Sequence, residues 1–429
     1  MHYKVKGTYD LLPNDSVKWQ YVSRKLASIF SRYNYHEIRT PIMEYSEVIH
    51  RQGEFSDMVQ KETYNFVDKG NRNITLRPEA TAGIMRSIIE NKSYAQTDLL
   101  KYYYIGPNYR YERPQKGRFR EFYQFGVEAV GLKSPYLDAE VIMLASDIIL
   151  EFGLDGVLIK INSLGDDLSR SNYQKALVDY FTKHTSDLCA DCNNRLNTNP
   201  LRILDCKVDF GKPVLLNAPK SVDYLTKESK EHFETVLKVL ADNNVNYEVD
   251  HNLVRGIDYY SETVFEVHAN IKSFGNANTL AGGGCYDNLS KDLGGPELSG
   301  VGFSFGMERF IEALEVSNVL PDLKHNLDAY LIAFSDDFKG YTANVLKALR
   351  DEGLLAEMDY DNKSFKSKLR KALSNEPKFL IFIGEDEVKN NKLSVKNTKT
   401  EVQEEMTLSD FLKLLKGEWR WNTHITIMN

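Results

Sequence analysis

Residues 104–128 read YIGPNYRYERPQKGRFREFYQFGVE, and this stretch decides the fold prediction. In an extended strand, residues two apart share one face. One face of the second half is polar and carries Arg118, Arg120, Phe122, Gln124, Gly126 and Glu128. The other is an apolar core face and carries Phe119, Tyr123, Phe125, Val127 and Ala129. Fold stability alone favours small, neutral groups on a sheet, so the charged and amide groups of the polar face predict a binding site.

The first half of the stretch has the same pattern, which predicts a two-stranded hairpin. Its polar face carries Tyr104, Asn108, Arg110 and Glu112. Residues 113–117, RPQKG, supply turn residues and two more cations. Because a planar guanidinium binds phosphate oxygens in bidentate fashion, this arginine-rich face favours a phosphate-rich ligand. The alternative is a solvent-exposed antiparallel sheet whose outer face is simply charged.

Length and composition set the broad class of protein. With 429 residues, 42% of them hydrophobic, the chain is long enough for two or three packed domains. The first fifteen residues hold no apolar run, and no stretch approaches the ~18 apolar residues of a membrane span. We therefore expect a cytoplasmic protein without membrane association. The net charge of −7 argues against general nucleic-acid coating, including DNA, but allows a local surface that binds one folded RNA.

The N-terminal part combines a helix, an edge segment and a hairpin. A helical period covers residues 16–33, and Pro41 beyond it suits a sheet edge or an interface. Residues 64–77 are typical of a hairpin, and residues 82–89 of a helix. Glu79 and Thr81 lie between these two elements, where they either cap the helix or bind a ligand. Capping by Thr81 is the default expectation.

The middle of the chain changes character between residues 166 and 232, where short helical runs are broken by Asn, Gly and Pro. This change predicts a small helical insertion. With His184 as a fourth ligand, a three-cysteine zinc site is conceivable from Cys189, Cys192 and Cys206. The spacing is loose and no second paired ligand follows, so buried, reduced cysteines are the favoured interpretation.

Three later stretches carry residue types suited to ligand contact. Residues 253–260 read LVRGIDYY, and residues 280–287 read LAGGGCYD, a glycine run that lets backbone approach a ligand closely. Residues 301–310, VGFSFGMERF, predict a strand that turns into a helix. Arg309 falls in the first turn of that helix, whose N-terminus favours anions, with an exposed surface arginine as the alternative.

The C-terminal part begins a new pattern at about residue 326. Strands and helices alternate as far as residue 415, which predicts a separate α/β domain with a largely parallel sheet. Residues 363–371 hold five cations. They favour an RNA contact, although a solvated helix face is at least as common.

These stretches together resemble a known family. The pattern RxERPxxGRxREFxQ at residues 110–124 and the strand–helix at residues 302–309 resemble motifs 2 and 3 of class II aminoacyl-tRNA synthetases. The early helix and the Pro41 segment resemble motif 1, the dimer-forming element. LVRGIDYY and the GGGCYD of residues 282–287 resemble the two histidine-specific motifs of histidyl-tRNA synthetases. The resemblance covers essentially the whole chain.

The resemblance implies a fold and an activity. The fold is a class II α+β catalytic domain, an antiparallel sheet flanked by helices, over residues 1–325. It would contain the helical insertion at 166–232 and be followed by an α/β anticodon-binding domain over 326–429. The activity is that of a homodimeric enzyme that uses ATP and Mg²⁺ to convert L-histidine to histidyl-adenylate and passes the histidyl group to tRNA(His).

The resemblance also implies how ATP binds. Arg110 would hold the α-phosphate, Glu112 the adenine edge and Phe122 one adenine face. Arg309 would lie on the other face of the adenine and near the γ-phosphate. Arg118 would meet the outer phosphates.

The implied histidine-binding residues are Glu79, Thr81, Gln124, Glu128, Arg255, Tyr259, Tyr260 and Tyr286. Glu128 and Tyr260 would recognise the imidazole nitrogens, because a carboxylate and a phenol together satisfy both. Arg255, with Arg110 the implied catalytic pair, would span the histidine carboxylate and the α-phosphate and stabilise the transition state. Catalysis is then positioning plus electrostatics. Gln115 would touch the acceptor end of the tRNA.

Three positions depart from the family pattern. Ala80 and Ile257 stand for the usual glycine and leucine, small changes of volume that we expect to be tolerated. Cys285 stands for an arginine beside the histidine pocket, a loss that would lower activity or mark a paralogue.

Two alternative functions follow from the same resemblance. One is the synthetase-like, histidine-sensing regulatory subunit of ATP phosphoribosyltransferase. Such subunits usually lack the anticodon domain and catalytic arginines, whereas this chain has residues 326–415, Arg110, Arg255 and Arg309. The other is a synthetase for glycine, threonine or proline, against which the LVRGIDYY segment argues.

Overall fold

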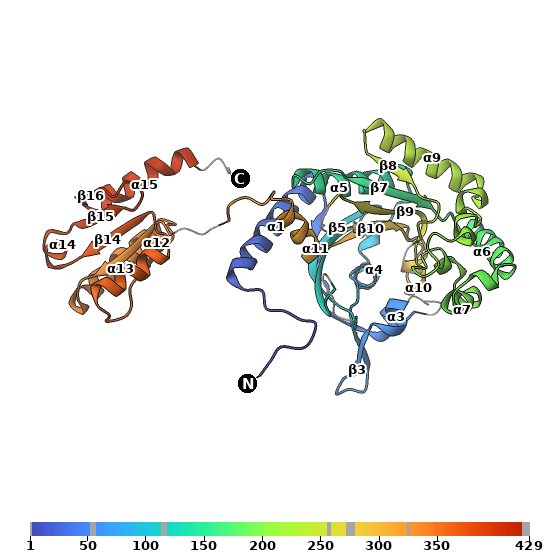
Figure 1. The fold of residues 1–429 in the computed structure, drawn as a ribbon, viewed down its shortest axis with the longest axis horizontal. Helices are drawn as coiled ribbons and strands as arrows, with labels where there is room; N and C mark the ends of the chain where they lie inside the picture. Colours follow the sequence, from blue (N-terminus) through green and yellow to red (C-terminus); the bar gives the residue numbers. More distant parts are fainter. Residues whose placement is uncertain are drawn as a thin grey trace. The chain divides into compact units, whose positions relative to one another are not determined.

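The computed structural model describes residues 2–51, 57–112, 118–254, 259–271, 279–323 and 327–422. Three residues singled out above, Gln115, Arg255 and Ile257, lie outside these ranges. The chain divides into two compact units, Met1–Pro321 and Asp322–Asn429 (Figure 1). Each unit has a hydrophobic core of its own. Among the described helices, none has the length and apolar character needed to cross a membrane.

An eight-stranded sheet organises the larger unit. In spatial order its strands are β1 (His36–Glu37), β5 (Leu100–Tyr109), β6 (Glu121–Val130), β11 (Gly300–Gly306), β10 (Thr279–Cys285), β9 (Ser261–His268), β7 (Leu158–Ser163) and β8 (Tyr247–Val249). Pairings from β5 through β7 are antiparallel, and the outer pairings β1·β5 and β7·β8 are parallel. β5 and β6 form the predicted hairpin, with Tyr104 opposite Gly126 and Asn108 opposite Phe122. The predicted antiparallel-rich sheet is therefore confirmed.

Helices cover one face of this sheet. They are α1 (Pro13–Arg32), α5 (Pro135–Glu151), α9 (Lys227–Asp242) and α11 (Met307–Val316). Phe125, Val127 and Ala129 of β6 pack beneath them in the main core. Because strand side chains alternate, Gln124 and Glu128 point to the opposite face. The sheet thus has the apolar and the polar face that the sequence alternation predicts.

Smaller elements complete the N-terminal part. β2 (Met43–Tyr45), β4 (Asn73–Leu76) and β3 (Tyr64–Val67) form an antiparallel sheet, which confirms the hairpin predicted over residues 64–77. Short helices follow β2: α2 (Ser46–Ile49) and α3 (Asp57–Lys61). α4 (Thr81–Glu90) packs with Tyr104 and Val130 on the polar side of the large sheet. Pro41 lies between β1 and β2, which are edge strands, as predicted.

Between β7 and β8 the chain is helical. The elements are α6 (Asp167–Thr182), η2 (Thr185–Asp187), α7 (Ala190–Thr198), η3 (Pro200–Ile203), α8 (Pro213–Leu216), η4 (Ser221–Tyr224) and α9. α9 runs ten residues past 232, to Asp242. The other short helices of this unit are η1 (Ser93–Ala95) and α10 (Leu289–Asp292).

The smaller unit is a five-stranded sheet with helices on both faces. Its elements in chain order are β12 (Ala329–Ala333), η6 (Asp336–Phe338), α12 (Lys339–Asp351), β13 (Ala356–Met358), α13 (Phe365–Ser374), β14 (Phe379–Ile383), α14 (Glu385–Asn390), β15 (Leu393–Asn397), β16 (Gln403–Met406) and α15 (Leu408–Asn422). α12 and α15 pack on one face, and Leu369 and Ala372 of α13 on the other. β12, β13 and β14 are parallel, but β15 and β16 add two antiparallel pairings, so the prediction of a largely parallel sheet is only half right.

The cation run of this unit is not a uniform RNA-facing surface. Lys368 is 4% exposed, and its ammonium group lies 3.2 Å from the carboxylate of Asp359. It also donates a hydrogen bond to the carbonyl oxygen of Ala333. Lys368 therefore ties α13 to the sheet.

Candidate active site

A cavity of about 430 Å³ opens on the polar face of the large sheet. Its walls come from the β4–α4 junction, β5, β6, β10, β11 and the insertion. Ten of the predicted site residues line it: Glu79, Thr81, Arg110, Glu112, Arg118, Gln124, Glu128, Tyr259, Tyr260 and Tyr286. The fold thus brings together residues that are more than two hundred positions apart in the chain.

Glycines in β11 make room for the polar side chains of β6. Gly302 lies opposite Glu128 in the sheet register. A Cβ at Gly302 would lie 2.1 Å from a carboxylate oxygen of Glu128 and 2.4 Å from the carbonyl oxygen of Val127. Only glycine is compatible with so close an approach.

Glu128 is the centre of the inner end of the cavity. Its side chain is 2% exposed. The hydroxyl of Thr81 donates to one carboxylate oxygen at 2.6 Å, and the phenol of Tyr286 donates to the other. Burial raises the pKa of Glu128 to about 8, an effect that the nearby Glu79 reinforces and the two hydrogen bonds oppose. The carboxylate is thus held in place and is poised between its two protonation states near neutral pH.

Three tyrosines form one wall beside Glu128. The ring of Tyr259 lies with its centroid 5.0 Å from that of Tyr260 and 5.8 Å from that of Tyr286. The guanidinium of Arg51 lies 5.6 Å from the Tyr259 ring, a cation–π contact. Burial raises the pKa values of Tyr259 and Tyr286 well above the usual range, so both phenols stay protonated, and that of Tyr286 donates to Glu128.

The prediction that Thr81 caps the α4 helix is wrong. The Glu79 carboxylate is the cap, because it accepts hydrogen bonds from the backbone N–H groups of Thr81 and Ala82. The position before the helix, Ala80, provides no side-chain cap. Thr81 is left to bond Glu128, and Glu79 presents a fixed, anionic edge to the cavity.

The outer end of the cavity carries the arginines. Arg110 donates from Nε to the carbonyl oxygen of Pro78 at 2.9 Å, and its guanidinium lies 5.0 Å from the Phe122 ring. Burial lowers the pKa of Arg110. Arg118 pairs with Glu112 at 3.0 Å. This end of the cavity therefore carries most of its positive charge.

Phe122 and Arg309 are not part of the cavity walls. The ring of Phe122 is in cation–π contact with the guanidinium of Arg110. Arg309 lies on α11, just past Gly306, which does line the cavity. Burial lowers the pKa of Arg309, and the charge of Arg118 lowers it further. Both side chains therefore border the arginine-rich end without facing its open space.

Ser304, Arg202 and Asp205 line the cavity but were not among the predicted site residues. Asn108, behind the lining, donates to the amide oxygen of Gln124 at 2.7 Å, and Gln124 donates to Ser304 at 3.3 Å, so these hydrogen bonds fix the Gln124 amide. Ser304 was predictable, since it alternates with two cavity glycines on β11. Arg202 and Asp205 of the insertion also line the cavity. Nothing in their local sequence distinguishes them.

Cys285 does not lie beside the histidine pocket, contrary to the expectation from the sequence. It belongs to the core on the helix-covered face of the sheet. Its sulfur lies 3.0 Å from the carboxylate of Asp138 on α5. The same carboxylate oxygen bonds Thr263 and His232. Replacement of the family's arginine at this position therefore does not remove a group from the cavity.

Both units of the chain are similar to known protein families. Residues 7–310 match the family model described as histidyl-tRNA synthetase, and residues 328–418 match the model described as anticodon binding domain. The histidine–tRNA ligase of Acholeplasma laidlawii is 51% identical over 96% of this chain and 98% of its own length. The histidine–tRNA ligase of Bacillus licheniformis is 46% identical over 96% of this chain and 97% of its own length.

A solved structure agrees with these matches. The crystal structure of apo S. aureus histidyl-tRNA synthetase superposes with a TM-score of 0.83 at 39% identity, covering 96% of this chain and 99% of that one. The match covers both units, so the similarity is not limited to the large sheet. On the strength of the family model and of relatives at 51% and 46% identity, the chain belongs to the histidyl-tRNA synthetase family.

Proposed function

We propose that this chain joins L-histidine to tRNA(His) in two steps. First, a carboxylate oxygen of histidine attacks the α-phosphorus of ATP; a new O–P bond forms, and the bond to the β-phosphate breaks to release pyrophosphate. Second, a ribose hydroxyl of the terminal adenosine of the tRNA attacks the carbonyl carbon of histidyl-adenylate, and AMP leaves. The full-length similarity to proteins named histidine–tRNA ligases supports this proposal.

The buried carboxylate of Glu128 is the observation that favours histidine as the amino-acid substrate. A neutral imidazole has one N–H donor and one nitrogen acceptor. Glu128 accepts from the N–H, and the phenol of Tyr260 donates to the other nitrogen. Thr81 and Tyr286 hold the carboxylate for this contact. An amino acid without the N–H leaves a buried polar group unpaired, which such sites reject strongly.

The α-amino group of histidine binds beside this pocket. Glu79, Thr81 and Gln124 receive it, with the Glu79 carboxylate as the main electrostatic partner. The backbone N–H groups at the start of α4 hold Glu79 in position before the ligand arrives. Preorganisation of this kind lowers the cost of binding.

ATP occupies the arginine-rich end. Arg110 binds the α-phosphate, Arg118 the outer phosphates, and Glu112 the adenine edge. Phe122 and Arg309 enclose the adenine, so both must turn toward the open space when ATP binds. Arg255 bridges the histidine carboxylate and the α-phosphate and stabilises the charge that builds up there. The attacking carboxylate is already ionised, so no general base is needed.

Magnesium accompanies the triphosphate. Mg²⁺ prefers oxygen ligands and usually keeps several waters. Of the lining carboxylates near the arginines, Glu112 pairs with Arg118 and Glu62 lies near Arg110, so phosphate oxygens would supply most of the coordination. When bound, the ion offsets negative charge on the outer phosphates.

We also propose a homodimer, formed through the segment that resembles motif 1. Ile42, Met43 and Tyr45 on and beside β2 are exposed, as are Phe66 and Val67 on β3. Met43, Tyr45 and Phe66 share one face of the three-stranded sheet, in which β2 and β3 are the outer strands. Exposed apolar side chains on one sheet face are typical of an interface. Sedimentation should show a dimer, and Met43→Asp with Phe66→Asp should convert it to a monomer. A cytoplasmic location stays a prediction.

The test of the proposed activity is histidine-dependent exchange of labelled pyrophosphate into ATP, run with each of the twenty amino acids and without tRNA. Exchange with histidine alone is the expected result. Exchange with glycine, threonine or proline instead would overturn the choice of amino acid. Histidine binding without any exchange would mean a sensing subunit, which the presence of the anticodon-binding unit argues against.

A further inference from the structure

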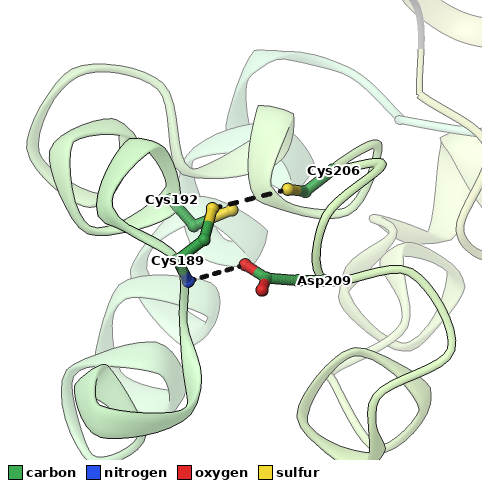
Figure 2. A group of neighbouring side chains, drawn as sticks. All are labelled: Cys189, Cys192, Cys206 and Asp209. Atoms are coloured by element: carbon green, nitrogen blue, oxygen red, sulfur yellow. Dashed lines mark hydrogen bonds between the residues drawn. The ribbon is translucent and has the colours of Figure 1, made fainter.

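Four side chains converge in the insertion, outside the active-site cavity. Cys189 is the residue before α7, and Cys192 lies in its first turn. Cys206 and Asp209 come from the loop after η3. One sulfur or carboxylate oxygen of each lies within 4.8 Å of the others, and Figure 2 shows all four side chains turned toward one another. His184, the fourth ligand expected from the sequence, is not a member; it contacts Asp187 and Tyr180.

The spacing of this cluster suits a tetrahedral metal ion. The sulfur atoms of Cys189 and Cys206 are 3.7 Å apart. A tetrahedral zinc site with Zn–S bonds of about 2.3 Å requires sulfur atoms about 3.8 Å apart. A disulfide requires about 2.05 Å. The two thiols are free, and their separation matches shared ligation.

The cluster includes backbone donors to sulfur. The N–H groups of Val208 and Asp209 donate to the sulfur of Cys206. Cys189 and Cys192 lie at the N-terminal end of α7, where the helix dipole favours negative charge. Buried, inert cysteines need none of these donors.

The burial of Asp209 is separate support for a metal site. Its side chain is fully buried, although carboxylates are almost never fully buried unless paired. Lys212 donates to one of its oxygens at 2.6 Å and the N–H of Cys189 to the other at 2.9 Å. Outer contacts of this kind fix and orient ligating carboxylates in metal sites. The charge of Lys212 also offsets part of the excess negative charge of three thiolates and a carboxylate.

We propose that Cys189, Cys192, Cys206 and Asp209 bind one Zn²⁺ ion in a closed, structural site. Thiolates are soft ligands that select zinc over magnesium or calcium, and four protein ligands leave no open position for catalysis. The ion cross-links the start of α7 to the loop after η3.

The site has a consequence for the active-site cavity. Asp205 is the neighbour of Cys206, and Arg202 lies on η3; both line the cavity and pair with each other at 3.3 Å. Cys192, Leu201 and Cys206 belong to the same hydrophobic core. Zinc at the cluster therefore fixes the segment that forms one wall of the cavity.

The test is the metal content of the full chain, expressed with added zinc and purified without chelators. Elemental analysis should give about one zinc per chain. Cys192→Ser and Cys206→Ser should each lose it. Cys285→Ser is the matched control, since it changes the one cysteine outside the cluster, and it should keep the metal. Two results would overturn the proposal. One is wild-type protein that contains no zinc and takes up none on reconstitution. The other is a Cys189–Cys206 disulfide found by mass spectrometry.

Cobalt substitution tests the ligands even if a serine variant folds poorly. Wild-type protein with Co²⁺ should show sulfur-to-cobalt charge transfer and the strong visible bands of tetrahedral cobalt. Asp209→Cys should keep the tetrahedral bands and increase the charge-transfer intensity. Asp209→Ala should weaken Co²⁺ binding by more than about 100-fold, beyond the loss expected for an outer contact. A spectrum unchanged in both Asp209 variants would exclude Asp209 as a ligand, and one unchanged in Cys192→Ser would exclude the site.

Discussion

At the scale of single residues, the site is organised by one buried carboxylate. Glu128 is close to two hydroxyl donors and to a second acid, Glu79, yet the described residues place no cation on it. A buried carboxylate without a cation is costly in the free protein. That cost is consistent with a ligand that supplies an N–H donor when it binds.

Glu128→Gln should abolish recognition of histidine. The amide cannot accept from the imidazole N–H and from both hydroxyls as the carboxylate does. We expect kcat/KM for histidine-dependent pyrophosphate exchange to fall by on the order of 100-fold or more. Glu121→Gln is the control, since Glu121 lies on the same strand but on the opposite face. Equal losses in both variants would mean that strand stability, not recognition, is measured.

The same substitution should change how stability depends on pH. The pKa of Glu128 is about 8 in the folded protein against an ordinary value of 4.5. The contribution of this raised pKa to stability is fully present below about pH 4.5 and is lost as the pH rises through about 8. Glutamine does not titrate, so Glu128→Gln should gain stability relative to the wild type over this interval. Urea unfolding of both proteins between about pH 5 and pH 9 checks this; a constant difference would contradict it.

Alternation along β6 predicted that Gln124 and Glu128 share the cavity, but it also grouped Phe122 with them, which is not part of the cavity walls. It could not predict the roles of Glu79 and Thr81, because capping depends on the direction in which α4 leaves the sheet. Nor could it place Cys285. A register shift between Gly284 and Cys285 interrupts the pairing with β9 there, and sequence spacing does not show such a shift.

At the scale of elements, β11 depends on a glycine at position 302, where no side chain fits. Gly302→Ala would place a Cβ against the Glu128 carboxylate and the Val127 carbonyl, so the strand or the carboxylate must move. We expect a loss of about 1–3 kcal/mol in the free energy of unfolding and a large loss of histidine affinity. Gly306→Ala is the matched control on the same strand, where the nearest atom, Cβ of Arg309, would be 4.0 Å away. Unfolding and calorimetric titration with histidine should separate the two variants.

The Cys285 position belongs to the junction of α5, α9 and β9. Lys133 pairs there with Glu262 and Asp287, and the cavity that remains is about 10 Å³. The arginine usual in the family would overfill this space, and Lys133 and His232 already supply positive charge or hydrogen bonds to the acids. Cys285→Arg should therefore destabilise the chain by about 1–3 kcal/mol, whereas Cys285→Ser should leave pyrophosphate exchange nearly unchanged. Higher activity in Cys285→Arg would restore the view that this arginine serves the pocket.

At the scale of the whole molecule, the division into two parts could be seen in the sequence, because hydrophobic periodicity changes from a polar-faced antiparallel pattern to alternating strands and helices. The antiparallel strands β15 and β16 were not foreseen. Gln403–Met406 has mostly exposed, polar side chains, so it carries no apolar alternation to detect. Pairing with β15, a property of the assembled sheet, is what makes it a strand.

Each of the two units has its own hydrophobic core, and we expect each to have its own function. Residues 1–321 contain every described residue that lines the cavity, and residues 322–429 have their own sheet and helices. The match to anticodon-binding domains lies entirely within the second unit. A chain ending at Pro321 should therefore keep histidine-dependent pyrophosphate exchange within about tenfold of the full chain, since domains with separate cores fold as units. Charging of tRNA(His) should fall by on the order of 100-fold or more, because the contacts of a second binding domain are lost. Loss of both activities together, in a fragment that is folded by circular dichroism, would show that the C-terminal unit takes part in adenylate formation as well.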